Sequence, residues 1–167
     1  MAELQEIWES KLEPVYPYRK AGPTVEKING KLNAPAAPKI GVAKPKVIIP
    51  VFPGTNCEYD TAKAFARAGA DPEILVIRNL TPADVTASCE ALVKAIGESQ
   101  IVMLPGGFSG GDEPDGSAKF IASFFRSPAV TEAVRDLLQH RDGLMLGICN
   151  GFQALIKLGL VPYGDIR

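Results

Sequence analysis

Residues 144–153 read LMLGICNGFQ, and this stretch decides the fold that we expect for the rest of the chain. A short apolar run ends at Cys149, and the residues after it favour a helix. Gly147 and Gly151 stand two positions before and two positions after the cysteine. A nucleophile on a sharp strand-to-helix turn needs small residues at these positions, because larger side chains would collide there. The stretch therefore predicts a nucleophile elbow that displays the sulfur of Cys149.

The helix expected after the elbow has a chemical consequence for the cysteine. Its first N–H groups and the positive end of its dipole are directed at the sulfur, which favours the thiolate over the thiol. The alternative interpretation is a buried structural cysteine beside a packing glycine, since free cysteine is often a small core residue. The glycines on both sides of Cys149 favour the nucleophile.

From Lys46 onward, short β-branched runs alternate with helical segments, a pattern typical of βαβ units and an open parallel sheet. The fold class that we expect is therefore α/β. The expected strands cover residues 47–52, 74–77 and 101–104 and the run from Leu144 into the elbow. The expected helices cover residues 58–68, 82–96 with Thr81 as N-cap, 119–125, 127–138, and 150–158 with Gly159 as its end.

The first 45 residues differ in composition from the rest, with proline scattered among lysines and no sustained apolar periodicity. Through Lys46 the chain has eight basic and five acidic residues, whereas the remainder has ten and fourteen. This change of sign supports a boundary between an irregular N-terminal tail or linker at 1–45 and a domain at 46–167. Within the tail we expect a short helix at 3–12 whose apolar stripe docks on another surface. The stripe comprises Leu4, Ile7, Trp8 and Leu12.

Charge and composition exclude several classes of function. The net charge is −1, which gives no electrostatic case for binding nucleic acid or an anionic membrane surface. The chain has no apolar run of about 18 residues and no secretory signal, so we expect a cytoplasmic protein. Three widely spaced cysteines fit neither a disulfide framework nor a CxxC metal site, and a single histidine excludes a histidine-rich site. We therefore expect no metal.

Loops that follow the strands of a parallel sheet emerge at its carboxyl edge, so segments 53–60 and 105–112 should share one crevice with the elbow. The glycines of PGGFSGGD at 105–112 let backbone N–H groups approach a substrate oxygen. We expect an oxyanion hole from the N–H of Asn150 and an N–H of Gly106 or Gly107, each donor contributing about 3 kcal/mol. The alternative is a phosphate-binding loop, but its glycine spacing fits neither GxxxxGK nor GxGxxG.

A cysteine nucleophile also needs a base, which later protonates the leaving amine. The single histidine, His140, ends the helix before the fourth strand, and we expect it at the amino edge of the sheet, away from the elbow. Cys57 lies in the first crevice loop and is a competing thiol, whereas Cys89 is expected to be a core residue. The sequence thus supplies a nucleophile without an identifiable base.

Three motifs in this chain together resemble one known family. They are GICNGFQ at 147–153, LPGGFS at 104–109 followed by Gly111-Asp112, and PGTNCEYD at 53–60. The combination resembles the class I glutamine amidotransferase domain of phosphoribosylformylglycinamidine synthase over residues 46–167. In addition, WESKLEPVY at 8–16 resembles the tail that leaves the synthetase portion in fused versions of that enzyme. The resemblance implies a flavodoxin-like, three-layer α/β/α open parallel sheet.

The resemblance also implies a reaction. Cys149 would attack the side-chain amide of glutamine, form a glutamyl thioester and release ammonia. Gly106 and Gly107 would supply the oxyanion contact, and four residues would contact the substrate, namely Asn56, Phe108, Ser109 and Gln153. The ammonia would pass to a separate synthetase region that uses ATP and Mg²⁺ to convert formylglycinamide ribonucleotide to its amidine. The domain itself would hold no cofactor.

The catalytic His and Glu of that family lie well downstream of the elbow, and this chain stops before them. We therefore expect a partial domain that does not hydrolyse glutamine by itself and that self-associates through an uncovered sheet edge. Two other functions stay open. One is another cysteine hydrolase of the same fold superfamily, although an acid or His commonly follows the cysteine where this chain has Asn150. The other is a non-catalytic module that docks on a synthetase.

Overall fold

The computed structural model describes residues 1–15, 41–108 and 117–167. The chain divides into two compact units, Met1–Ala36 and Ala37–Arg167. The described part of the first unit contains helix α1 (Ala2–Ser10), which matches the helix expected at 3–12. Its apolar side chains Leu4, Ile7 and Trp8 are exposed. Docking of this stripe on another surface remains a prediction.

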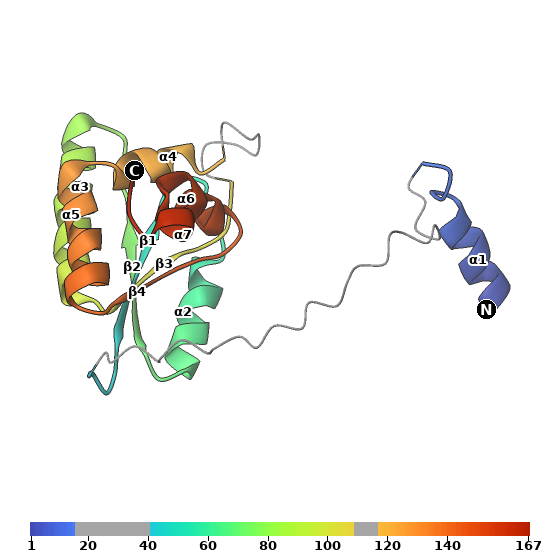
Figure 1. Ribbon diagram of the computed structural model, residues 1–167, viewed down its shortest axis with the longest axis horizontal. Helices are drawn as coiled ribbons and strands as arrows, with labels where there is room; N and C mark the ends of the chain where they lie inside the picture. Colours follow the sequence, from blue (N-terminus) through green and yellow to red (C-terminus); the bar gives the residue numbers. More distant parts are fainter. Residues whose placement is uncertain (16–40, 109–116) are drawn as a thin grey trace. The chain divides into compact units, whose positions relative to one another are not determined.

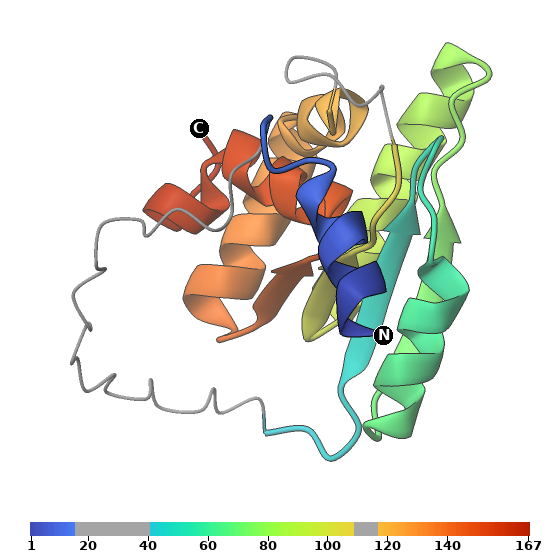
Figure 2. The same cartoon turned by 90° about the vertical axis from the view of Figure 1, so that its right-hand side faces the viewer.

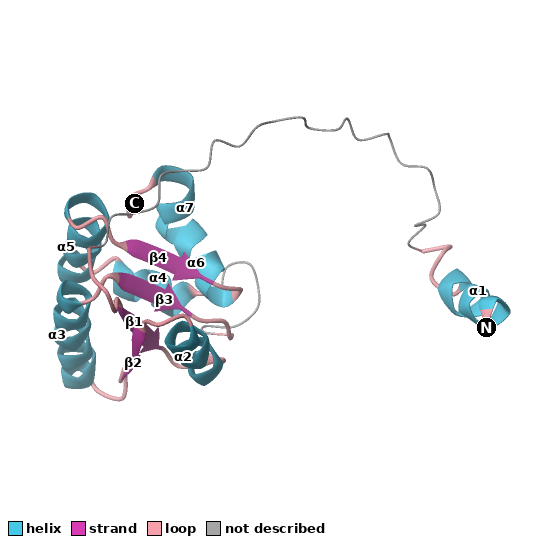
Figure 3. Ribbon diagram, turned by 90° about the horizontal axis from the view of Figure 1, so that it is seen from below, coloured by secondary structure: helices cyan, strands magenta, loops and turns pink. Residues whose placement is uncertain are grey.

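The second unit is built on an all-parallel sheet, which confirms the α/β fold class. Among the described residues the strand order is β2-β1-β3-β4 (Figure 3). The strands are β1 (Lys46–Val51), β2 (Asp71–Val76), β3 (Ile101–Leu104) and β4 (Leu144–Gly147). β1 and β3, which precede two of the crevice loops, pair directly at the centre, and β3 pairs with β4, which enters the elbow.

Helices follow the strands, and those up to α6 stand in the order that the sequence predicts. They are α2 (Glu58–Arg67), α3 (Pro82–Glu98), α4 (Lys119–Phe125), α5 (Pro128–Arg135), α6 (Asn150–Leu158) and the short α7 (Leu160–Tyr163). α3 and α5 run side by side, and α4 and α6 lie together near the carboxyl ends of the strands (Figures 1 and 2). In the ranges described, no helix is long and apolar enough to cross a membrane.

The two faces of the sheet bury different sets of side chains. One face, with Ile48, Val102 and Leu104, packs against α3, α4, α5 and α6 in a continuous apolar cluster. The opposite face, with Val47 and Ile49, packs against α2. Helices therefore cover both sides of the sheet, which confirms the three-layer, flavodoxin-like architecture. Burial of both faces explains why the central strands read as continuous apolar runs.

The structure differs from the sequence prediction where α5 ends. The expected helix over 127–138 gives way to a π-helical turn, η1 (Asp136–His140), in which the N–H of Arg141 donates to the carbonyl of Asp136 at 3.1 Å. The wider turn places the guanidinium of Arg141 against three carbonyl oxygens at the C-terminal end of α3. These belong to Ile96, Gly97 and Ser99. This long-range contact supplies side-chain donors to carbonyls at the end of α3, where intrahelical donors run out.

Candidate active site

The chain turns sharply between β4 and α6, and Cys149 lies at the turn with φ 53° and ψ −112°. The N–H of Gly151 donates to the carbonyl of Ile148 at 2.9 Å and closes the turn. These angles are close to those of the first central residue in a type II′ turn, a position at which glycine is preferred. A cysteine there is strained, by about 1–3 kcal/mol for such backbone outliers. Cys149 is exposed, as the predicted elbow requires.

The two glycines of the elbow are required by close packing. A Cβ added at Gly147 would lie 2.6 Å from the carbonyl carbon of Gly151. A Cβ added at Gly151 would lie 2.0 Å from the carbonyl oxygen of Leu104, at the end of β3. Since real Cβ atoms do not approach other atoms so closely, the helix can leave the sheet here only with glycine at both positions. The strand–turn–helix geometry predicted from 144–153 is thus present.

The glycine loop after β3 passes directly over the elbow. A Cβ added at Gly106 would lie 3.4 Å from the Cβ of Cys149, so the loop backbone runs close to Cys149. Gly107 has φ +138°, and a Cβ there would lie 2.2 Å from the carbonyl oxygen of Gly54. Only glycine allows this loop to fit between the elbow and the segment after β1.

Backbone hydrogen bonds join the loops after β1 and β3. The N–H of Asn56 donates to the carbonyl of Gly106 at 2.7 Å, and the N–H of Phe108 donates to the carbonyl of Gly54 at 2.9 Å. In a trans peptide the carbonyl and the following N–H point in opposite directions. The carbonyl of Gly106 faces Asn56 in the loop after β1. The N–H of Gly107 therefore points away from that loop. This geometry favours Gly107 as an oxyanion donor.

Side-chain hydrogen bonds join Ser117 to two residues in the first turn of α6. The Nδ2 group of Asn150 donates to Ser117 Oγ at 3.2 Å and to Gln153 Oε1 at 3.0 Å. The hydroxyl of Ser117 also donates to Gln153 Oε1. Asn150 and Ser117 are almost fully buried, at 2% and 5% exposure. Gln153 was predicted from the sequence to contact the substrate, whereas Ser117 was not identified.

The remaining predicted substrate contacts are distributed unevenly. Phe108 is exposed at the carboxyl edge, whereas Asn56 uses its side-chain oxygen to accept the N–H of Cys57 at 3.0 Å. Ser109 and residues 110–112 lie outside the described residues. The substrate-binding roles of all four predicted residues stay predictions.

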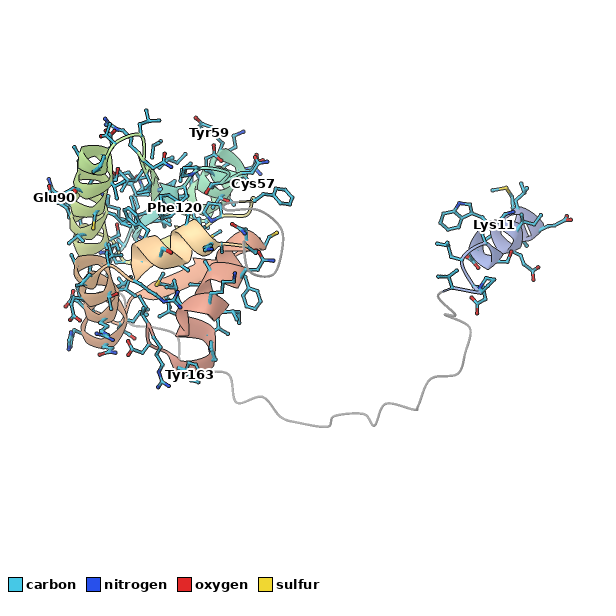
Figure 4. The ribbon with its side chains drawn as sticks, turned by 90° about the horizontal axis from the view of Figure 1, so that it is seen from above. Lys11, Cys57, Tyr59, Glu90, Phe120 and Tyr163 are labelled. Atoms are coloured by element: carbon cyan, nitrogen blue, oxygen red, sulfur yellow. The ribbon has the colours of Figure 1, made fainter. Side chains whose placement is uncertain are left out.

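The other two cysteines differ in their surroundings. Cys57 is exposed and precedes the first turn of α2 with φ 68°, so it is a second accessible thiol near the crevice (Figure 4). Cys89 is half-buried in α3, and its sulfur lies 3.6 Å from Ser127 Oγ. Cys89 packs against the main apolar cluster.

The single histidine lies at the opposite edge of the sheet from Cys149. His140 ends η1, which leads into the amino end of β4, and its Nδ1 is 3.5 Å from the carboxylate of Asp136. Cys149 follows the carboxyl end of the same strand. Since His140 is the single histidine of the 167 residues, no imidazole lies beside Cys149. Among the described residues there is also no group of three His, Cys, Asp or Glu side chains that could hold a metal.

The sequence of the second unit matches a family of known proteins. Residues 44–167 match the CobB/CobQ-like glutamine amidotransferase domain family. The chain belongs to this family. The resemblance drawn from the three crevice motifs is thereby confirmed.

Relatives with similar sequences carry the name of one enzyme subunit. The chain is 36% identical over 121 residues to the phosphoribosylformylglycinamidine synthase subunit PurQ of Dehalococcoides mccartyi, covering 72% of this chain and 43% of that protein. It is 40% identical over 122 residues to the PurQ subunit of Cereibacter sphaeroides, covering 73% and 46%. A solved structure of PurLQS from Thermotoga maritima matches with 28% identity and a TM-score of 0.46, covering 70% of this chain and 45% of that chain. The chain thus spans less than half the length of these relatives.

Proposed function

We propose that the chain is the glutaminase portion of phosphoribosylformylglycinamidine synthase and acts in de novo purine biosynthesis in the cytoplasm. The observation that carries the proposal is the strained elbow of Cys149 with the backbone of Gly106 directly against it. The names of the PurQ relatives support the same reaction.

In the proposed reaction, the sulfur of Cys149 attacks the side-chain amide carbon of glutamine. The carbonyl oxygen takes up negative charge, which the N–H groups of Gly107 and Asn150 stabilise. The C–N bond then breaks, ammonia leaves with an added proton, and a glutamyl thioester remains. Water hydrolyses the thioester to glutamate and restores the thiol. The domain uses no cofactor of its own, while ATP and Mg²⁺ serve the synthetase region that consumes the ammonia.

Proton transfer is the step for which we identify no residue in the part of the chain that the structure describes. A base must activate the thiol, and an acid must protonate the leaving amine. His140 lies at the far edge of the sheet and serves neither purpose. We therefore infer that the chain by itself binds glutamine without turning it over at an enzymatic rate.

The test uses L-2-amino-4-oxo-5-chloropentanoic acid, a chloroketone that resembles glutamine. We expect saturable labelling of Cys149, protected by glutamine and about tenfold or more faster than labelling of Cys57, because a formed site aligns the reacting atoms. Cys149→Ala should abolish the fast phase, and the matched variant Cys57→Ala should retain it. Mass spectrometry of the labelled peptides provides the measurement.

Two results would contradict the proposal. Equal, unprotected labelling of both cysteines would favour a non-catalytic docking module. Protection by an unrelated amide or ester but not by glutamine would favour another cysteine hydrolase. If the wild-type chain released ammonia from glutamine and Cys149→Ala did not, only the inference that the chain does not turn glutamine over would be wrong.

A further inference from the structure

The segment after β1 forms a tight turn whose two ends are joined by two hydrogen bonds. The N–H of Thr55 donates to the carbonyl of Phe52 at 2.9 Å, and the N–H of Phe52 donates to Thr55 Oγ1 at 3.0 Å. Pro53 and Gly54, which has φ 86°, occupy the two central positions, where a type II turn prefers these residue types. The hydroxyl of Thr55 therefore adds a second closure to a turn that the backbone already closes.

The first residue of this turn is fixed in the core. Phe52 is 2% exposed, and its ring makes edge contacts with Phe120 and Phe124 of α4 at centroid distances of 5.7 and 5.4 Å. Without the hydroxyl of Thr55, the N–H of Phe52 would lose its acceptor at the edge of the core, which is unfavourable. The hydrogen bond thus fixes the position of Thr55 relative to the sheet and α4.

The turn holds the glycine loop that follows β3. Thr55 and Gly107 form an antiparallel bridge, on one side of which the N–H of Asn56 donates to the carbonyl of Gly106 at 2.7 Å. A second hydrogen bond, of 2.9 Å, joins the two loops on the other side of the bridge. A Cβ added at Gly107 would lie 2.9 Å from the Cα of Thr55, so the two backbones are in direct contact. The carbonyl of Gly106 is therefore held toward the turn.

The peptide group between Gly106 and Gly107 needs this support. Glycine on both sides of a peptide group removes the Cβ contacts that restrict its rotation. The backbone at Gly106 runs close to Cys149, since a Cβ added there would lie 3.4 Å from the Cβ of Cys149. If the peptide group turned over, the N–H of Asn56 would lose its acceptor and an oxygen would replace the N–H that points away from the turn. Such an oxygen would repel the negative charge of a tetrahedral intermediate, whereas an N–H stabilises it.

We propose that Thr55 is a positioning residue for the oxyanion hole. Its hydroxyl fixes the turn after β1, and the turn holds the N–H of Gly107 in the direction of the substrate oxygen. This inference rests on the proposed glutaminase function and adds to it a residue outside the elbow and the glycine loop. In this role the hydroxyl of Thr55 binds Phe52 and does not touch the substrate. Thr55 affects the rate of attack rather than the binding of glutamine, because negative charge develops on the oxygen only as the sulfur attacks.

The test uses Thr55→Val, which keeps the branched shape of the side chain and removes the acceptor. The full chain is labelled with L-2-amino-4-oxo-5-chloropentanoic acid, on whose ketone oxygen negative charge develops when the sulfur attacks. We expect the maximal labelling rate of Cys149 to fall about tenfold, short of the roughly hundredfold effect of losing an oxyanion donor outright. The half-saturating concentration should change little. Methyl methanethiosulfonate, which modifies sulfur and has no carbonyl group, should label Cys149 at an unchanged rate.

Two further variants separate positioning from a general effect on the fold. Thr55→Ser keeps the hydroxyl and should restore the wild-type rate. Thr86→Val is the matched control, because it removes a hydroxyl that donates to the carbonyl of Pro82 at 3.1 Å on α3, remote from the crevice. It should leave labelling by both reagents unchanged. Thermal unfolding of each variant reports its stability.

Amide hydrogen exchange measured by NMR reports the bridge itself. In Thr55→Val the N–H groups of Asn56 and Phe108, which join the two loops, should exchange faster than in the wild type. The N–H of Ile77 is the internal control, since it donates to the carbonyl of Val51 at 2.9 Å beside the same end of β1. Its exchange should not change.

Each outcome supports or overturns the proposal. Unsaturable labelling of the wild-type chain would refute the proposed function and the positioning role together. Saturable labelling with an unchanged maximal rate in Thr55→Val, or an equal fall with both reagents, would overturn the positioning role alone. Exchange of the Asn56 and Phe108 amides in the wild type at the rate of an unstructured peptide would also overturn it, even where Thr55→Val fails to fold. A fall confined to the chloroketone and restored in Thr55→Ser is the expected result.

Discussion

Gly151 shows at a single residue how little space the elbow leaves. Its missing side chain allows the first turn of α6 to approach the carbonyl oxygen of Leu104, and an added Cβ would lie 2.0 Å from that oxygen. The obstacle is backbone at the end of a central strand, which cannot move without disturbing the sheet. The packing of α6 against β3 therefore depends on this one position.

Gly151→Ala should destabilise the domain by about 1–3 kcal/mol or more, the range for overpacking a tight site. Gly97 provides the matched control, since a Cβ there meets nothing within 4 Å and the residue lies inside α3. Gly97→Ala should stabilise the domain by about 0.5–1 kcal/mol, because alanine favours a helix more than glycine does. Urea unfolding followed by circular dichroism measures both changes. Equal effects of the two substitutions would contradict the packing argument.

Residues whose neighbours are close in the chain could be predicted from the sequence. Gly147, Cys149 and Gly151 form a local spacing, and the turn that they predict is present. Ser117 could not be found in this way, because its partners lie 33 and 36 positions further along the chain. A single serine in a sequence does not indicate which distant residue its hydroxyl will bind.

Among the elements, α5 is joined to the segment after α7 by an ion pair. Arg135 donates to both oxygens of Asp165, at 2.8 and 3.1 Å. The hydrogen bonds from Arg135 hold the pKa of the Asp165 carboxyl below its usual value. They also raise the pKa of the guanidinium, which stays charged throughout. The pair connects residues 164–167, including the buried Ile166, to the rest of the domain.

This ion pair makes part of the stability depend on pH. A carboxyl with a lowered pKa in the folded state stabilises the fold above its ordinary pKa, and the contribution disappears as pH falls through the folded-state value. Asp165→Asn should therefore lower the urea midpoint at pH 7, and its difference from the wild type should shrink as the pH is lowered toward about 3. Glu90→Gln, at an exposed position on α3 (Figure 4), should change little at either pH. A difference that is constant across this range would argue against the linkage.

The ends of helices and strands could be predicted where neighbouring residues in the sequence determine them. The Thr81 cap of α3 is an example, since its side chain accepts the N–H of Asp84 and the Asp84 carboxylate accepts the N–H of Thr81. β2 begins three residues earlier than predicted, at Asp71, because Pro72 is tolerated on an edge strand. The π-helical turn η1 and helix α7 were not predicted. The Arg141 contacts that accompany η1 are made across the fold.

For the molecule as a whole, the sequence indicated a parallel sheet but not its strand order. Alternation of strands and helices establishes parallel pairing, yet it does not say which strand lies at the edge. In the described sheet β4 is an edge strand, next to a groove of about 420 Å³ between α2 and the sheet. Leu146 and Ile148 line this groove and are about half exposed.

We expect this surface to cause self-association, because an exposed strand edge beside apolar side chains favours pairing with a second copy. Sedimentation velocity should show a species that grows with protein concentration. Leu146→Lys should weaken the association about tenfold or more, since it would bury an unpaired charge. Leu80→Lys is the matched control, at an almost fully exposed leucine outside the groove. A monomer at all concentrations would refute the expectation.

The angles of Cys149 have a consequence for the handedness of the chain. Reflected in a mirror, φ 53° and ψ −112° fall close to the angles of about −60° and +120° that ordinary residues adopt at the first central position of a type II turn. A D-amino acid would therefore lie at this position without strain, but its side chain would leave the backbone in a different direction. At Cys149 the domain holds an L-stereocentre in a conformation suited to its mirror image. That conformation is what directs the sulfur outward.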